Sequence, residues 1–534
     1  MNAAQASPDF PAVSLRDVEA LSDLYAEPDW MRAARRDAWA LAQEMPLPHQ
    51  KEEAWRRTPL HRFPLDSLRV AIAKRAPISP DDLPPCWHHN MAPENLVSGT
   101  LVHCNDANSY QTMRPEDVRS GVIFDNLHRA LHTHGDLIRR YWMQGRTTRP
   151  DFNKFTALHA ALWHGGTFVY VPAGARVSRP LQSLVAYDAD SGSGLHHTLI
   201  IAGKGSRVSL IQDRVSQERQ PELNLEMVEI YAEAGAFVRY ASFQHWGDNR
   251  YALSVQEANL AQDANFVWVN GALGGRMSKD FLTTSLNAPG ARVQMHGYTF
   301  AVGDQHFDQS TYQHHRAPNT HSNLLYRNVL RDQARTVFYG MIRAEQEAAG
   351  MEGYQANNNL LLSDAHAHSI PGLEIRCNDV RCSHGSTTSR SVTNDPERFP
   401  MRTGTPARVG YASVRNHLTS PRLYEKLQTD IYRWHSYTDV FLDGRWVKAT
   451  PVFNVQLCRK LGIEPLEFDG RSDSLFQEYD PIGRRYMEYL DHHGTFADVP
   501  FETIVNDFRI HYPALMQGGM SGDFQSEAVS GDLP

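Results

Sequence analysis

A four-residue motif recurs about every 30 residues in the middle of the chain. Each copy begins with Gly or Ala and ends with Val. The copies begin at Gly174, Gly205, Gly235, Ala264 and Gly290, and a weaker one begins at Ala334. The first three steps are 31, 30 and 29 residues. A chain with such a period is expected to bury each repeat against the next one.

This period favours one fold class. Periods of about 20–50 residues are typical of solenoids and propellers. A propeller blade needs about 40 residues and four strands, whereas each unit here has room for two or three short strands. We therefore predict a mainly β fold with a β-solenoid over residues 167–384, in which small turn residues let successive coils stack. A β-sandwich with similar turns is the alternative that the pattern leaves open.

The segment before the repeat is predicted to be helical. Ser14 precedes apolar residues at steps of three, and Asp29 precedes a second amphipathic stretch, so each is predicted to begin a helix. Two further helices are predicted over residues 118–141 and 155–162. A proline-rich stretch over residues 76–98 is interpreted as a linker.

After residue 408 the pattern changes to α+β. Residues 437–441 and 446–447 are predicted to form a hairpin around the turn Asp443-Gly444, and residues 455–461 a helix. The whole chain is divided into three parts by these patterns. They are a helical N-terminal region with its linker (1–100), a β-helix core with its leading helices (101–390) and a partial α+β segment with a frayed tail (391–534).

Composition argues against several classes of protein. The net charge is −8 and there is no basic block, which argues against nucleic-acid binding. No apolar run reaches the ~18 residues of a membrane helix, and the N-terminus lacks the features of a secretory signal. Five cysteines in 534 residues do not make a disulfide framework. We therefore expect a cytoplasmic protein that binds neither nucleic acid nor membrane.

The densest set of chemically active residues lies at the end of the repeat region. Cys382 and His384 are two positions apart, so on a strand both side chains point to one face. A thiolate and an imidazole on one face can bind a soft or borderline metal ion. Two ligands do not complete a tetrahedral site, so further ligands would come from another chain or from sulfide. An ordinary half-buried cysteine beside a hydrogen-bonded histidine is the alternative.

Histidine is abundant, with 26 residues. Seven of these gather in the second half of the repeat region: His296, His306, His314, His315, His321, His366 and His368. Their spacing leaves open whether they converge on one site. Histidines on a solenoid are usually surface or turn residues.

Two enzyme classes are alternative interpretations of the sequence. A transglutaminase-like cysteine amidase or protease would use His435 with a thiolate nucleophile, yet no cysteine precedes His435 on a plausible helix of this region. A β-helix enzyme that acts on carbohydrate would need a cluster of carboxylates on one coil face. We therefore expect no catalytic residue and no enzyme activity.

Several motifs taken together resemble one known family. They are QKEEAWR (50–56), FNKFTAL (152–158), GTFVYVP (166–172), NNLLLS (358–363), LEI (373–375) and DVRCSHGST (379–387). Over roughly residues 25–390 the chain resembles the SufB/SufD family of iron–sulfur cluster assembly proteins. The Cys-Ser-His-Gly sequence at 382–385 resembles the SufD branch, since the SufB branch has a glutamate-containing variant there.

The resemblance implies a fold, a function and partners. The fold is a right-handed parallel β-helix after a helical N-terminal region. The function is a non-enzymatic scaffold that acts with a SufB-like subunit and a SufC-like ATPase. A transient iron–sulfur cluster, or iron, is implied at the partner interface, and the family's site residues correspond to His384 with Cys382 beside it.

The resemblance ends after residue 387. The SufD pattern continues into a helical C-terminal domain that docks the SufC ATPase, whereas this chain has a different segment. Residues 404–513 resemble the second half of a transglutaminase-like domain, through GTPARVG (404–410), VRNHL (414–418) and DGRWVKATP (443–451). His435 matches that family's catalytic histidine, but the matching cysteine and aspartate are absent. We therefore expect a truncated, inactive segment and altered SufC docking.

Overall fold

In the computed structural model the chain forms two compact units, Met1–Val392 and Thr393–Pro534. The residues that the structure describes are 6–7, 9–70, 90–188, 191–390, 407–417, 424, 427–442, 444–450, 471–475, 487–496 and 500–513. No helix among these residues is long and apolar enough to cross a membrane.

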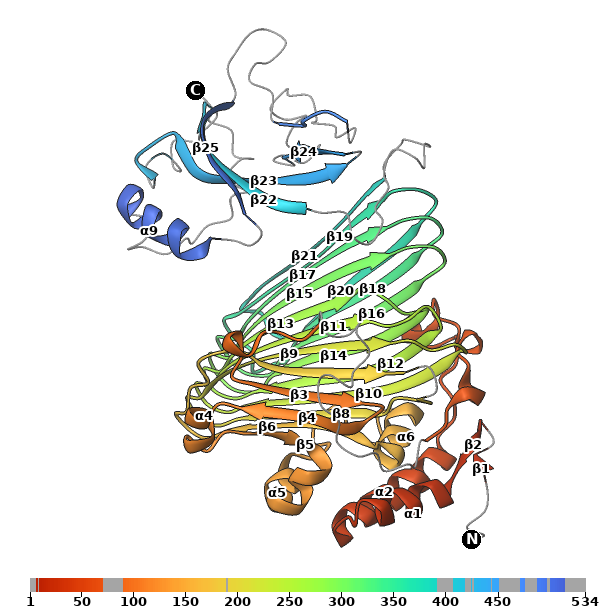
Figure 1. The fold of residues 1–534 in the computed structure, drawn as a ribbon. Coiled ribbons are helices and arrows are strands. Elements are labelled where there is room, and N and C mark those ends of the chain that lie inside the picture. The colour runs from red at the N-terminus through yellow and green to blue at the C-terminus, as the bar shows by residue number, and fades with distance from the viewer. Residues whose placement is uncertain are drawn as a thin grey trace. The chain divides into compact units, whose positions relative to one another are not determined.

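The first unit is built around a β-solenoid of eight coils, each of which adds one strand to each of two sheets (Figure 1). The nine-stranded sheet contains β5 (Ile123–Asn126), β6 (Gly165–Val171), β8 (His196–Ala202), β10 (Glu222–Ala232), β12 (Arg250–Leu260), β14 (Met277–Leu286), β16 (His306–His315), β18 (Arg335–Ala344) and β20 (His366–Ile375). The ten-stranded sheet contains β3 (Gly99–Cys104), β4 (Ala107–Met113), β7 (Leu181–Tyr187), β9 (Arg207–Ser216), β11 (Phe237–His245), β13 (Asn265–Ala272), β15 (Arg292–Ala301), β17 (His321–Leu330), β19 (Met351–Leu361) and β21 (Val380–Arg390).

Almost all strand pairs in the two sheets are parallel. The exceptions are β4 and β5, which pair antiparallel with β3 and β6 at the N-terminal end of the solenoid. The alternation of strands between two parallel sheets confirms the predicted β-solenoid and excludes the β-sandwich.

The recurring motif marks the turns at which coils stack. Gly205 and Gly235 have φ values of 66° and 68°, a left-handed conformation that glycine adopts without steric cost. The amide of Gly205 donates to the carbonyl of Ala234 in the next coil over 2.9 Å. Val208 and Val238, which end two copies of the motif, are buried in the interior.

The weak sixth copy of the motif occupies a different place. Ala334 precedes β18 of the nine-stranded sheet, whereas the other copies precede strands of the ten-stranded sheet. In the ten-stranded sheet the next coil begins instead at His321, after Asn319 with φ 56°. Asp332, with φ 62°, makes a similar tight turn before β18. Because both sides of the solenoid use such turns, the assignment of Ala334 to the same series was wrong.

The interior of the solenoid has an apolar side and a polar side. Aromatic side chains, including Phe266 and Trp268, pack together on the apolar side. On the polar side, Arg214 donates to Gln212 over 3.3 Å and forms an ion pair with Glu226 at 3.3 Å. Each buried charge in this group therefore has a partner, as burial requires.

Helices α5 (Leu127–Tyr141) and α6 (Lys154–Leu162) lie against β6, β8 and β10 on the outer face of the nine-stranded sheet, and α1 (Leu15–Leu24) and α2 (Asp29–Glu44) pack on α6 (Figure 1). The N-terminal region also contains α4 (Pro115–Arg119), the short strands β1 (Ala6–Ser7) and β2 (Phe10–Ser14), and 3-10 turns at Glu53–Trp55, Leu60–Arg62, Leu65–Ser67 and Glu94–Leu96. Every residue of α6 is buried because α6 lies between α2 and β10. The helices predicted after Ser14, from Asp29 and over 155–162 are confirmed.

The single helix predicted over residues 118–141 is wrong. The chain forms α4, then β5, then α5. Gly121, with φ 81°, ends the first helix, and the buried side chains of Val122 and Phe124 then follow strand geometry at the edge of the nine-stranded sheet. Packing against β6 thus decides the conformation of a segment whose composition fits a helix.

The second unit contains an antiparallel sheet in the order β24-β23-β22-β25, followed by helix α9 (Phe501–His511). Its strands are β22 (Ala407–Asn416), β23 (Ile431–Leu442), β24 (Arg445–Ala449) and β25 (Met487–Phe496). Leu442 pairs with Arg445, and Gly444 has φ 80°, which confirms the predicted hairpin. The helix predicted over 455–461 and most of the predicted linker lie outside the described residues.

Candidate functional site

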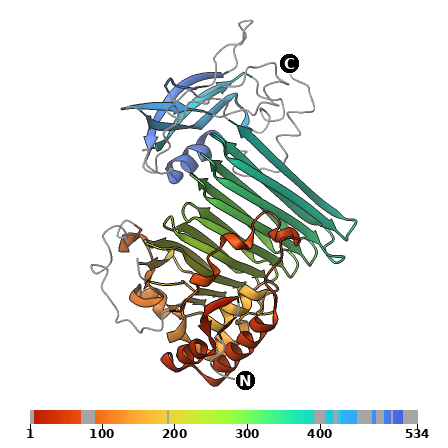
Figure 2. The ribbon, with the colours of Figure 1, turned by 90° about the vertical axis from the view of Figure 1, so that its right-hand side faces the viewer.

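The last coil of the solenoid is formed by β20 and β21 (Figure 2), and we call it the free end because no described strand of the first unit pairs beyond it. β20 pairs with β18, and β21 pairs with β19. Within the described part of the chain, no strand pairs with the other edge of either one. Each of the two strands therefore presents a row of unpaired backbone N–H and C=O groups, which is a template for adding another strand.

Cys382 and His384 both lie in β21, opposite Gly353 and Gln355 of β19. Gln355 is fully buried inside the solenoid, and residues directly opposite in a sheet share a face. Cys382 and His384 therefore both belong to the inward face of the last coil. Because no described strand stacks on that coil, His384 is exposed and Cys382 is only half-buried.

The surroundings of Cys382 are apolar. Its side chain packs against a cluster that includes Ile342, Ala348 and Met351. Burial raises the pKa of the Cys382 thiol to about 11, so the group is a neutral thiol at neutral pH. Cys377 is half-buried in the turn between β20 and β21. Of the two residues predicted to bind metal, His384 is thus the more accessible one.

Apolar side chains surround this end of the solenoid. Leu373 and Ile375 of β20 pair with Ile342 and Ala344, which are buried in the interior. They therefore face inward, yet they are 38% and 40% exposed. An uncovered core of this kind is typical of a surface that meets another protein.

The seven histidines of the repeat region do not converge. His296 and His321 face outward from the ten-stranded sheet, His306, His314, His366 and His368 face outward from the nine-stranded sheet, and His315 points inward. His315 hydrogen-bonds Thr320 and Ser322 at 2.8 Å each. Among the described residues, no group of three or more His, Cys, Asp or Glu side chains is arranged to hold a metal ion.

A buried hydrogen-bonded chain beneath α6 escaped the sequence reasoning. His159 Nε2 lies 3.2 Å from His197 Nδ1, and His197 Nε2 lies 3.2 Å from Glu229 Oε2. His159 Nδ1 donates to the carbonyl of Leu225 over 2.9 Å, so its Nε2 accepts from His197. Burial raises the pKa of Glu229 to about 7 and lowers that of His197 well below its usual value. The shared proton therefore belongs to Glu229.

A second buried cluster, also not foreseen, surrounds Asp106 in the turn between β3 and β4. His164 and His196 each place a ring nitrogen 3.2 Å from its carboxylate, and the hydroxyl of Tyr187 donates to it over 2.7 Å. Burial opposes ionisation of Asp106, but the two histidines hold its pKa well below the usual range. The cluster joins the first coil to the hairpin that precedes it.

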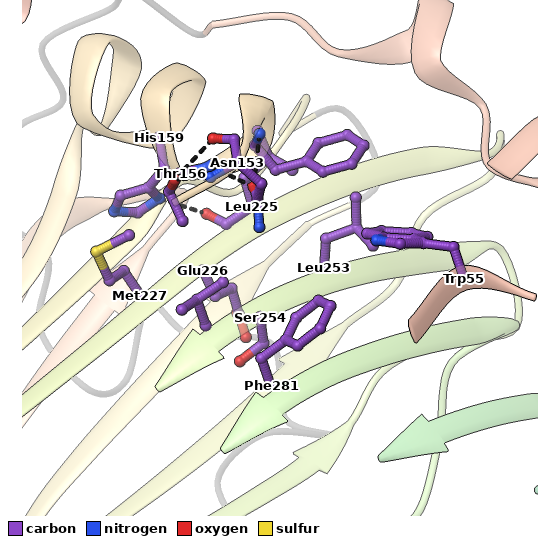
Figure 3. A pocket seen from close by; sticks show the side chains of 12 residues that line it. Trp55, Asn153, Thr156, His159, Leu225, Glu226, Met227, Leu253, Ser254 and Phe281 are labelled. Carbon is purple, nitrogen blue, oxygen red and sulfur yellow. Dashed lines mark hydrogen bonds between the residues drawn. The ribbon is translucent and has the colours of Figure 1, made fainter. Parts of the chain in front are cut away.

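Two hollows lie against the outer face of the nine-stranded sheet. The smaller one lies between α6, Trp55 and strands β10, β12 and β14, and its volume of about 10 Å³ leaves room for one water molecule at most (Figure 3). It is too small for a cofactor. The larger one is an open groove of about 610 Å³, lined by charges of both signs that include Arg146, Arg316 and Glu345. Neither hollow includes Cys382 or His384.

His435 lies in β23 of the second unit, with its ring centroid 6.2 Å from that of Tyr489. Burial lowers the pKa of His435. The described cysteines, Cys104, Cys377 and Cys382, all lie in the first unit, and Cys458 lies outside the described residues. The thiol that a cysteine hydrolase needs therefore has no described counterpart in the unit that contains His435.

Comparisons with known proteins agree with this architecture. Residues 22–183 match the SufBD protein N-terminal region, and residues 185–394 match the SufBD core domain of SUF-system FeS cluster assembly. The iron–sulfur cluster assembly protein SufB of Bacillus subtilis is 24% identical over 384 residues, which cover 70% of this chain and 81% of that protein. An iron–sulfur cluster assembly SufBD family protein of Staphylococcus aureus is 25% identical over 384 residues, which again cover 70% of this chain and 81% of that protein.

The two matched regions meet within the first unit. The first spans the helices that cover the nine-stranded sheet together with the first strands of the solenoid, and the second spans the remaining coils to the free end. Together they extend over most of the chain. The chain thus belongs to the SufBD family of iron–sulfur cluster assembly proteins.

Proposed function

We propose that the chain is a SufD-type scaffold subunit that acts in the cytoplasm with a SufB-like subunit and a SufC-like ATPase, and that it is not an enzyme. The observation that carries the proposal is the free end of the solenoid, where two unpaired strand edges lie beside the exposed His384. The Cys-Ser-His-Gly sequence at 382–385 supports the SufD branch over the SufB branch.

The SufB-like subunit pairs with this end. Its strands add to β20 and β21, which supplies backbone hydrogen bonds. It also covers Leu373 and Ile375, whose apolar surface is otherwise left in water. Burial of apolar surface stabilises association by about 25 cal/mol per Å² before the cost of association is subtracted.

The cargo at this end is iron or a transient iron–sulfur cluster. His384 offers an imidazole, and Cys382 is the second candidate ligand. A metal ion binds the deprotonated thiolate, so the raised pKa of Cys382 makes it the weaker of the two ligands. The remaining ligands come from the partner subunit and from sulfide, because two protein ligands leave a tetrahedral iron incomplete.

We infer that the second unit is a transglutaminase-like segment without activity. Its antiparallel sheet and α9 stand where the SufD pattern has a helical domain that docks SufC. The SufC-like ATPase therefore binds mainly through the SufB-like subunit. Treatment of the native chain with a limiting amount of a thiol alkylator tests the inactivity. Cys458, the cysteine of the second unit, is expected to react no faster than the half-buried Cys377, and faster labelling of Cys458 contradicts the inference.

Anaerobic co-expression with SufB and SufC tests the proposal. The complex is isolated by size exclusion and analysed for iron and sulfide, for the native chain, for His384→Ala and for the matched control His321→Ala. His321 lies in β17, away from the free end, and contacts Glu352. We expect co-elution of all three chains and a loss of iron only with His384→Ala. Equal iron in both variants, or no co-elution with SufB, would refute the assigned role.

A further inference from the structure

The outer faces of the two sheets differ in coverage. In β10, β12 and β14 of the nine-stranded sheet almost every residue is buried, because α6 and the segment that contains Trp55 lie over the outer face. In β11, β15 and β17 of the ten-stranded sheet, buried residues alternate with exposed or half-buried ones. This alternation is typical of a sheet with one face in water. The described residues of the first unit thus leave the outer face of the ten-stranded sheet open from β9 to the last coil, whereas residues 90–92 cover β7.

This open face carries an excess of positive charge. Its outward positions hold five arginines and two carboxylates: Arg207, Arg239, Arg292, Arg327 and Arg381, with Asp213 and Glu352. Glu352 pairs with Arg381 at 3.3 Å and with His321 at 3.2 Å. The other four arginines form no ion pair with any carboxylate of the described residues. The chain as a whole carries a net charge of −8, so the sign of the charge on this face is opposite to that of the chain.

Aromatic side chains lie among these arginines. The guanidinium carbons of Arg207 and Arg239 are 4.8 and 5.0 Å from the ring centroid of Phe237. Tyr298 and Phe300 of β15 are 37% and 48% exposed. In the ten-stranded sheet, the outward positions of the strands from β9 to β21 contain no lysine. Arginine and aromatic residues without lysine are the composition of protein-binding surfaces.

The open face is large enough to bind a protein. The strands β11 to β21 span about 24 Å at ~4.8 Å per strand spacing, and eight residues along a strand extend about 26 Å. The product, about 600 Å², is close to the roughly 800 Å² that each partner buries in a stable complex. A second copy of the same face is excluded as the occupant, because two faces with a positive excess repel each other.

We propose that the outer face of the ten-stranded sheet docks a partner protein whose surface carries carboxylates around an apolar centre. The four arginines without a carboxylate partner supply the charge complementarity, and Tyr298 and Phe300 supply the apolar contact. The proposal rests on the open face alone and is independent of the proposed role in cluster assembly. Nucleic acid fits less well, because the remainder of the chain is acidic and repels a polyanion.

The experiment measures fluorescence anisotropy with the full chain and a labelled peptide in which pairs of glutamates alternate with single phenylalanines. The test variant is Arg239→Glu with Arg292→Glu. The control is Arg16→Glu with Arg119→Glu, two exposed arginines of α1 and α4 that change the net charge equally. We expect affinity for the peptide to fall about tenfold or more in the test variant and less than about twofold in the control. Binding is also expected to weaken with salt.

A second pair of variants tests the apolar contact. Phe300→Ser is expected to weaken binding severalfold, and Leu96→Ser, which removes an exposed side chain elsewhere, is expected to leave it unchanged. All these side chains are exposed, so melting temperatures should stay equal. The proposal fails if the native chain does not bind the peptide, if both double charge reversals reduce affinity equally, or if a single-stranded oligonucleotide binds this face more tightly than the peptide.

Discussion

Two neighbouring arginines of α2 are expected to differ sharply in their contribution to stability. Arg35 is fully buried and donates to Glu27 over 2.8 and 2.7 Å, to the carbonyl of Ala161 over 2.9 Å, and stacks on Trp163 at 4.6 Å. Arg36 is exposed and pairs with Glu19 at 2.6 Å. Arg35 thus joins α2 both to Glu27, in the turn before α2, and to α6, whereas the Arg36–Glu19 pair lies on the surface.

Replacement of Arg35 by Ala leaves the Glu27 carboxylate buried without its charge partner. Loss of one member of a buried ion pair destabilises a protein by about 3–5 kcal/mol. Arg36→Ala removes an ion pair that water already screens, so little measurable change in the free energy of unfolding is expected. The double variant Arg35→Met with Glu27→Leu removes both charges and is expected to recover much of the stability lost in Arg35→Ala.

Urea unfolding followed by far-ultraviolet circular dichroism and tryptophan fluorescence measures these differences. Both signals report mainly on the first unit, which contains eight of the ten tryptophans, Trp163 beside Arg35 among them, and most of the described helices. The native chain and Arg36→Ala are expected to be about equally stable, the double variant less stable, and Arg35→Ala the least stable. If Arg35→Ala is no less stable than Arg36→Ala, the assignment of a charge-compensating role to Arg35 is wrong.

Three further predictions follow from single contacts. Glu229 has a pKa of about 7 in the folded chain and 4.5 in the unfolded chain, so the folded state binds a proton more tightly and stability should fall as pH rises from about 4.5 to 7. The melting temperature should therefore depend less on pH in Glu229→Gln than in the native chain, and an equal dependence would count against the raised pKa. At pH 8 the thiol of Cys382 should react with iodoacetamide more slowly in the native chain than in urea, as measured by mass spectrometry; faster native labelling would contradict its raised pKa. Gly235→Ala should destabilise the first unit by about 1–2 kcal/mol because of its left-handed φ, whereas Gly385→Ala, which meets only an ordinary contact, should not.

The solenoid could be predicted because its cause is local and repeated. A turn that needs a small residue recurs from coil to coil, as at Gly205 and Gly235, so the sequence shows a period of about 30 residues. The strands β4 and β5 at the N-terminal end of the solenoid have no such recurring motif. β5 is four residues long and forms because Phe124 packs against β6, so composition alone predicted a helix there.

The candidate site was predicted in part for a similar reason. The two-residue spacing of Cys382 and His384 indicates a shared face, and the register with β19 places both on the inward one. Their environments depend on tertiary packing, so the burial of Cys382 could not be foreseen. The hydrogen-bonded chain His159–His197–Glu229 joins residues up to 70 positions apart through packing of α6 on the sheet, so no local sequence pattern predicts it.

The two ends of the solenoid are unlike, and this limits what the molecule can build. The N-terminal end finishes in the short antiparallel strands β4 and β5, with α5 following directly, while the last coil leaves two parallel strands unpaired. Two identical free ends would let copies join into an endless fibre, as stacked strands do in amyloid. The edge strands at the N-terminal end are the shorter ones, since β5 has four residues and β4 seven, against ten and eleven in β20 and β21. A short edge offers few backbone groups for pairing, so strand addition is favoured at the last coil and a pair is favoured over a fibre.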